Sequence, residues 1–131
     1  MTPELTILAV SIILHMGVMA AYSVKANREL GPKYPLSPRD GAPPKPLSQS
    51  CSRLQRVMNN SFESLILFAP AALMVGLTGQ SNGVTATLAV VFLIARILYI
   101  PAYVMGLVPG RSLIWGFGFF ATLALAIAAL I

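Results

Sequence analysis

The sequence is poor in charged residues, which make up 10% of its 131 positions, whereas 56% of the positions are hydrophobic. Few soluble domains are this apolar, so the composition favours a membrane protein with a single domain. The single cysteine, Cys51, excludes an intrachain disulfide and a cysteine-rich metal site. The single histidine, His15, stands without a second metal ligand, so we expect a packed or lipid-facing histidine and no bound metal.

The few charges are unevenly distributed, with nine Lys and Arg residues against four Asp and Glu residues. Most cations lie in or beside the first loop, namely Lys25, Arg28, Lys33, Arg39, Lys45, Arg53 and Arg56. The segment 78–83 carries no charge, and Arg111 lies in the last loop. The positive-inside rule then predicts that the first and third loops are cytoplasmic and that both termini lie outside. Because membrane topology accounts for the net charge of +5, we expect no nucleic-acid partner.

Four apolar segments are each long enough to cross a bilayer. We expect helices near residues 5–28, 53–78, 84–107 and 112–131, with a cytoplasmic proline-rich loop at 29–52. The predicted fold class is therefore all-α, a polytopic bundle of four transmembrane helices that forms one domain over residues 1–131. Four short helices enclose a thin interior, so a homo-oligomer is expected. The composition and charge pattern indicate a multi-pass protein of a bacterial inner membrane or of an endoplasmic-reticulum-type membrane.

Prolines and serines indicate where the second helix begins and bends. The prolines between residues 31 and 50 prevent a long helix in the first loop. Ser50 or Ser52 is placed to cap the second helix. Pro70 lies inside that helix and Pro101 inside the third, so each should disturb the local backbone hydrogen bonding.

A polar stripe marks the start of the second helix. Its members are spaced three, four and three residues apart: Arg53, Arg56, Asn60 and Glu63. At about 3.6 residues per turn, this spacing places all of them on one helix face. Charged and amide side chains within a membrane usually face the bundle interior or a polar cavity, because exposure to hydrocarbon is costly. The stripe is therefore the candidate site.

The third helix carries a matching set of polar residues. Arg96, Tyr99 and Tyr103 share a face, and Arg96 should lie at the same depth as Glu63 on the antiparallel neighbour. One interpretation is a buried ion pair between Arg96 and Glu63 that holds the two helices together. The other is a pocket for a small zwitterionic or polyanionic ligand, because guanidinium groups bind carboxylates and a glutamate can hold an ammonium group.

These motifs resemble the MAPEG family, the membrane-associated proteins of eicosanoid and glutathione metabolism. The family pattern of Arg, then Asn four residues later, then Glu three residues later, is matched by Arg56, Asn60 and Glu63, with Arg53 upstream. The segment 68–70 (Phe-Ala-Pro) is similar to the bacterial branch, which resembles microsomal glutathione transferases. The similarity covers almost the whole chain.

The resemblance implies a homotrimer with glutathione, as co-substrate, bound between adjacent subunits near the cytoplasmic side. The implied ligand-binding residues are Arg53, Arg56, Asn60, Glu63, Tyr99, Tyr103, Arg28 and Arg96. Tyr99 and Tyr103 would reach the pocket from the neighbouring subunit. Arg111 matches the arginine that stabilises the glutathione thiolate, one residue further from Tyr103 than in the leukotriene-synthesising enzymes, and Ser64 replaces a tyrosine of those enzymes.

The function implied is that of a glutathione transferase or peroxidase which conjugates lipophilic electrophiles or reduces lipid hydroperoxides, with membrane lipids around it. A free thiol has a pKa of about 8.5, so a nearby guanidinium would favour the nucleophilic thiolate. The placement of Arg111 and Ser64 leaves open a non-catalytic protein of the same fold that binds a lipid or another anionic ligand. A small four-helix transporter is a third hypothesis. A transporter would be expected to use an intramembrane carboxylate that is accessible from both sides in turn, whereas the candidate here, Glu63, is crowded by arginines.

Overall fold

The computed structural model describes all 131 residues and contains helices but no strands. The long helices are α1 (Pro3–Leu30), α3 (Gln49–Leu77), α4 (Gly83–Val104) and α5 (Gly110–Ala128), and the short α2 (Lys33–Leu36) lies within the first loop. Each of the four long helices is long and apolar enough to cross a membrane, with mean hydropathy between 1.5 and 2.1. The prediction of an all-α chain with four transmembrane helices is therefore confirmed.

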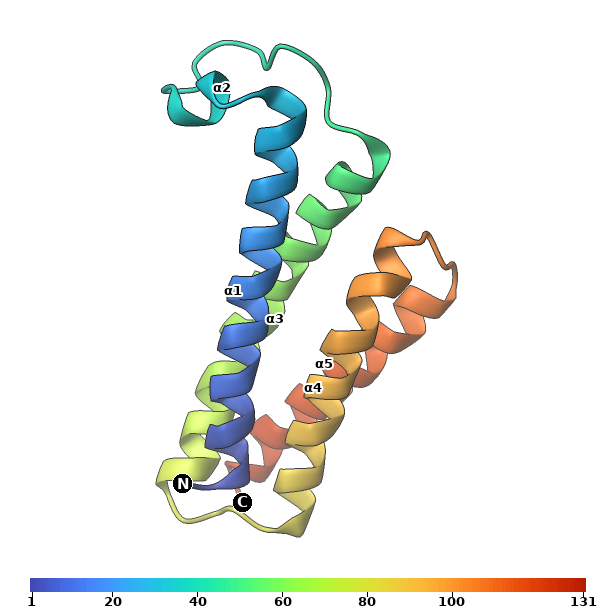
Figure 1. Ribbon diagram of the computed structural model, residues 1–131. Helices are drawn as coiled ribbons and strands as arrows, with labels where there is room; N and C mark the ends of the chain where they lie inside the picture. Colours follow the sequence, from blue (N-terminus) through green and yellow to red (C-terminus); the bar gives the residue numbers. More distant parts are fainter.

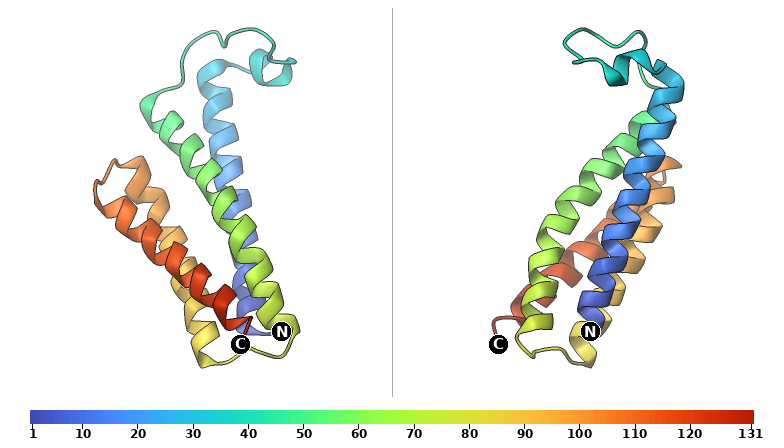
Figure 2. Two further views of the ribbon diagram at one scale, coloured as in Figure 1. Left: turned by 180° about the vertical axis from the view of Figure 1, so that it is seen from behind. Right: turned by 60° about the vertical axis from the view of Figure 1, so that its left-hand side comes forward.

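The long helices form two antiparallel hairpins, α1 with α3 and α4 with α5 (Figure 1). Both termini lie at the end of the bundle where the two hairpins come together. The hairpins diverge toward the opposite end, which carries α2 (Figures 1 and 2). We refer to these as the closed end and the open end. This arrangement follows from apolar helices joined by short loops, which must pack as antiparallel neighbours.

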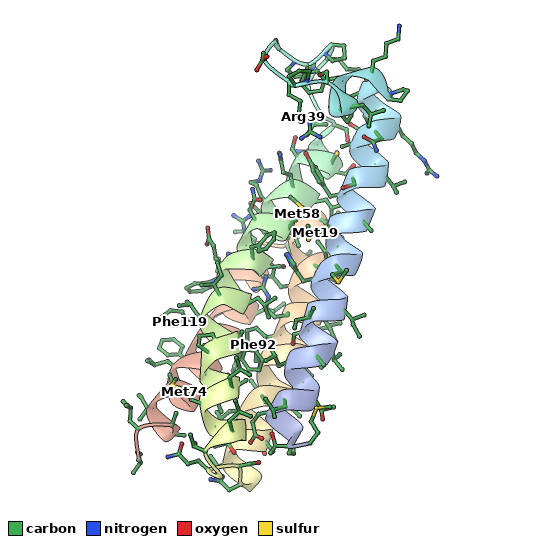
Figure 3. The ribbon with its side chains drawn as sticks, turned by 90° about the vertical axis from the view of Figure 1, so that its left-hand side faces the viewer. Met19, Arg39, Met58, Met74, Phe92 and Phe119 are labelled. Atoms are coloured by element: carbon green, nitrogen blue, oxygen red, sulfur yellow. The ribbon has the colours of Figure 1, made fainter.

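The hydrophobic core lies toward the closed end. Its buried members are Leu8, Phe68, Ala71, Ala72, Val75, Ala89, Phe92, Ala121 and Leu125. The rings of Phe68 and Phe92 stack with their centroids 3.9 Å apart, so the α1–α3 and α4–α5 hairpins meet at an aromatic pair. Figure 3 shows Phe92 about midway along the bundle. Small residues permit close approach elsewhere: a Cβ on Gly76 would lie 2.6 Å from Cγ of Leu5 on α1.

The second long helix begins earlier than predicted. Ser48 is its N-cap, and the Ser48 side chain accepts a hydrogen bond from the backbone N–H of Cys51 at 3.2 Å. The helix then starts at Gln49, whereas the sequence analysis placed its start near residue 53 with Ser50 or Ser52 as the cap, which was wrong. Pro46 is the last proline of the first loop, so no proline prevents the additional helical turn that precedes Arg53.

The third long helix ends earlier than predicted, at Val104 instead of near residue 107. The backbone N–H of Gly106 donates to Tyr103 O, and that of Leu107 donates to Ala102 O. Gly106 has φ of +72°, a left-handed conformation that glycine adopts without a steric penalty and that commonly terminates helices. The helix therefore ends at the turn around Gly106, although the apolar sequence continues beyond it.

Two glutamates tie the helix ends together. Glu29, near the end of α1, accepts hydrogen bonds from the N–H and the Oγ of Ser48, both at 2.7 Å, and it pairs with Lys25 at 3.8 Å. Glu4, in the first turn of α1, is fully buried and accepts hydrogen bonds from Oγ1 of Thr85 and from Oγ of Ser81, the latter at 2.8 Å. These carboxylates join α1 to the start of α3 and to the start of α4.

Candidate functional site

Polar side chains from three helices surround a pocket toward the open end. The pocket has a volume of about 280 Å³, and its lining residues are Asn60, Tyr99, Tyr103, Arg111, Ser112 and Trp115. We call it the polar pocket. The helical spacing of Asn60 on α3 and of the two tyrosines on α4 directs these side chains to the same place, as the sequence predicted. All of them meet within one chain, whereas the family resemblance implied that the tyrosines come from a neighbouring subunit.

Cations and aromatic rings alternate along one side of the polar pocket. The guanidinium carbon of Arg111 lies 4.5 Å from the ring centroid of Tyr103, and that of Arg56 lies 5.8 Å from the same centroid. Arg96 stacks over Tyr99 at 4.5 Å, and the two tyrosine rings are 5.6 Å apart. Cation–π contacts of this kind hold a guanidinium group without using its N–H donors.

Arg56 and Arg111 have no carboxylate partner in the chain. The only ion pair in the structure joins Lys25 to Glu29, and neither Arg56 nor Arg111 donates a side-chain hydrogen bond. Their N–H groups are therefore available to an anionic ligand. Arg111 lines the polar pocket, and Arg56 adds a second positive charge next to the ring of Tyr103, which lines the same pocket.

Asn60 lies at the boundary between the polar pocket and a second cavity. This second cavity, of about 260 Å³, is mostly apolar, and we call it the apolar groove; its lining residues are Asn60, Glu63, Ser64, Leu67, Phe92, Trp115, Gly118, Phe119, Thr122, Leu123 and Ala126. The Oδ1 atom of Asn60 is buried and has no hydrogen-bond partner within the chain. A buried acceptor without a donor is unfavourable, so the site is suited to a ligand that supplies an N–H.

Glu63 and Arg96 do not form the ion pair that was one interpretation of the sequence. Nη2 of Arg96 instead donates to Oγ of Ser61 at 2.9 Å. Glu63 is exposed and lines the apolar groove. Residues two apart on a helix point about 200° from one another, so Ser61 and Glu63 face different neighbours. The sequence predicted that Glu63 and Arg96 lie at a similar depth in the membrane, but similar depth does not mean that the two side chains point toward each other.

None of the four predicted ligand-binding arginines lines the polar pocket itself, and two of them, Arg53 and Arg28, have other contacts or surroundings. Nη1 of Arg53 donates to the backbone oxygen of Val104 at 3.1 Å, and its guanidinium lies against Gly106. It therefore caps the last turn of α4, where a cation interacts favourably with the helix dipole. Arg28 lines a separate surface hollow near the end of α1, together with Lys25 and others.

Two residues of the polar pocket, Ser112 and Trp115, were not predicted from the sequence. Both belong to the first turns of α5. The signal that could have found them is the short connection from Tyr103 to Arg111. A tight turn after α4 necessarily places the start of α5 beside the end of α4.

The sequence of this chain matches a known protein family. The sequence model of the MAPEG family matches residues 5–131 of this chain. No curated protein shows significant sequence similarity to it. The family match covers all four long helices, and with them the polar pocket and the apolar groove.

Proposed function

Since this chain belongs to the MAPEG family, we propose that it is a glutathione-dependent transferase or peroxidase that acts on lipophilic substrates. Its four apolar helices make it an integral, multi-pass membrane protein. The observation that carries the proposal is the polar pocket, where Arg56 and Arg111 share the ring of Tyr103 beside the unpartnered oxygen of Asn60.

The chemistry of glutathione is complementary to this set of side chains. Glutathione has two carboxylates, amide groups and one ammonium group. Guanidinium groups are suited to carboxylates, since they offer a planar pair of N–H donors. The Asn60 oxygen accepts an N–H, and the exposed carboxylate of Glu63 is one turn away for the ammonium group. The ligand would thus bind between the arginines and Glu63.

Arg111 is the residue that we assign to the reaction itself. A glutathione thiol is mostly protonated at neutral pH, and only the thiolate is a strong nucleophile. A guanidinium beside the sulfur stabilises the negative charge and increases the thiolate fraction. In a transferase the thiolate sulfur forms a bond to the electrophilic carbon of the substrate, while a leaving group departs with its electron pair or a double bond opens and takes up a proton. In a peroxidase the thiolate attacks the terminal oxygen of the hydroperoxide and the O–O bond breaks, which gives a sulfenic acid and an alkoxide that takes up a proton. A second glutathione thiol then reduces the sulfenic acid, with release of glutathione disulfide and water.

The apolar groove supports a lipophilic second substrate. It adjoins the polar pocket at Asn60 and Trp115, which line both cavities. Leu67, Phe119 and Leu123 also line this groove. Contact with these side chains would remove apolar surface of a bound substrate from water, which is favourable. A substrate dissolved in the bilayer would reach the thiolate through this groove without crossing water.

The proposed assembly is a homotrimer with loops one and three in the cytoplasm, in a bacterial inner membrane. In such a trimer Arg28, which lies apart from the polar pocket of its own chain, would contact a ligand held by a neighbouring subunit. The cluster of cations near the first loop supports this topology. Glutathione in the cytoplasm would then have direct access to the pocket.

The test is calorimetric titration of glutathione into the purified protein, its Arg56→Ala variant and an Arg39→Ala control. Arg39 lies in the first loop and donates to Pro35 O, away from the pocket, so its loss should leave binding unchanged. We expect binding to the parent and to Arg39→Ala, and at least tenfold weaker binding to Arg56→Ala. Absence of binding at millimolar glutathione would contradict the proposal and favour a member of the fold that binds a lipid or another anion.

A further inference from the structure

A second polar cluster lies in the interior, apart from the polar pocket, where α1, α3 and α4 meet. It consists of Ser11, His15, Ser61 and Arg96, which line a cavity of about 20 Å³ together with apolar side chains. Ser11, His15 and Arg96 are only 5–6% exposed. Four polar side chains around so small a space, within the membrane-spanning part of the chain, require an explanation.

Several atoms of this cluster lack hydrogen-bond partners in the chain. They are Oγ of Ser11 and both ring nitrogens, Nδ1 and Nε2, of His15. Arg96 donates one bond, to Ser61, and its remaining polar contact is with the face of Tyr99. A ring contact with Phe62, at 4.2 Å, orients the imidazole but satisfies neither nitrogen. Buried polar groups in stable proteins are nearly always paired, with protein or with ordered water.

We propose that this cavity binds one water molecule, which bridges His15 and Ser11 on α1 to Arg96 on α4. The volume is appropriate, because a water needs at least about 10–15 Å³ and two to four polar partners. The hydrogen-bond donors and acceptors around the cavity favour water over an anion. A guanidinium only donates, whereas a neutral imidazole has one nitrogen that must accept. A halide can accept from Arg96 but cannot donate to His15, and water does both.

The bound water gives His15 a positioning role. It connects α1 to Arg96, whose guanidinium lies over the ring of Tyr99, and Tyr99 lines the polar pocket. Neither His15 nor Ser11 lines that pocket. Through Arg96 the water therefore helps to fix Tyr99, a residue of the polar pocket, and the inference holds whichever ligand that pocket binds.

His15 is the only histidine, so its imidazole gives a single set of nitrogen signals in protein labelled with ¹⁵N-histidine. The measurement is solid-state NMR of the full chain in lipid bilayers, after removal of any histidine tag. We expect a neutral ring whose non-protonated nitrogen is hydrogen-bonded and shows a cross-peak to water protons. A ring protonated on both nitrogens would overturn the proposal. So would a ring without a water cross-peak, or one whose signals shift when chloride is replaced by bromide.

Two serines on α3 provide a matched pair of variants. Ser61 lines the water cavity, whereas Ser64, three residues further along, lines the apolar groove. Ser61→Ala should move the His15 nitrogen signals and weaken the water cross-peak, while Ser64→Ala should leave both unchanged. Equal effects, or no effect of Ser61→Ala, would count against the water site. The unmodified chain already provides the main result, so the test does not depend on either variant folding.

Discussion

The ring of Tyr103 is contacted by two guanidinium groups, with Arg111 at 4.5 Å and Arg56 at 5.8 Å from its centroid. The two arginines come from opposite hairpins, since Arg56 is on α3 and Arg111 is in the first turn of α5. One aromatic ring thus sets the spacing between two cations of the proposed glutathione site.

Arg111→Ala should lower turnover more than it lowers glutathione affinity. Without the guanidinium, the bound thiol should return to a pKa of about 8.5, and the thiolate fraction at pH 7 should fall roughly 25-fold if the parent pKa is about 6.5. Steady-state kcat and calorimetric Kd separate the two effects. Because the thiol of the variant ionises at higher pH, the loss should shrink as the pH rises toward 9.

Arg111→Lys is the control for charge at this position. It retains a cation, so it should preserve more activity than Arg111→Ala, although it loses the planar stacking on Tyr103. Equal turnover of the parent and Arg111→Ala would remove Arg111 from the mechanism.

Glu63→Gln should weaken glutathione binding about tenfold, because a charged acceptor is lost for the ammonium group; tenfold corresponds to about 1.4 kcal/mol. The free energy of unfolding should hardly change, since Glu63 is exposed and makes neither an ion pair nor a side-chain hydrogen bond in the chain. Calorimetry and denaturant unfolding in detergent measure the two quantities. A destabilised variant with unchanged affinity would assign Glu63 a structural role.

Ser48→Ala should destabilise the protein by about 1 kcal/mol, the usual cost of removing a helix N-cap. Its hydroxyl also donates to Glu29 at 2.7 Å, so the first loop should loosen at the same time. Ser52→Ala is the comparison, because Ser52 was expected to be a cap and its side chain makes no hydrogen bond in the structure. Denaturant unfolding of both variants is the measurement, and equal stabilities would contradict the assigned cap.

Thr85→Val should cost about 1–2 kcal/mol of stability, because it removes a hydrogen bond to the buried carboxylate of Glu4. Thr87→Val is a matched substitution on the same helix. Thr87 is exposed and its hydroxyl donates only to the backbone oxygen of Gly83, so its loss should change stability by less than about 0.5 kcal/mol. Thermal unfolding of the two variants against the parent tests the difference.

The helices could be predicted from the sequence because long apolar segments dominate it. Their ends were less predictable, since they depend on single residues: Ser48 caps α3 and Gly106 stops α4. The link between Glu4 and Thr85 could not be foreseen, because 81 positions separate its partners and no periodic pattern connects them.

The candidate site was predicted in part for a related reason. Helical spacing correctly brought Asn60, Tyr99 and Tyr103 together, because residues three and four apart share a face. The spacing gave no information on which neighbour each face meets. Arg96 therefore turned out to contact Ser61 on a different side of α3 from Glu63, and Arg53 caps α4 instead of lining the pocket.

The bond from Arg53 to Val104 has a consequence for motion. The hairpins pack most extensively near Phe68 and Phe92, and they diverge toward the other end of the bundle (Figures 1 and 2). A small rotation of one hairpin about that packed region displaces its distant end the most, as in any lever. Arg53 joins the hairpins near that distant end by one hydrogen bond to a backbone carbonyl. Loss of the Arg53 hydrogen bond should therefore increase breathing motions around Tyr103, and the buried cluster of Val18, Val57 and Tyr99, together with the contact of Arg56 with Tyr103, limits that increase.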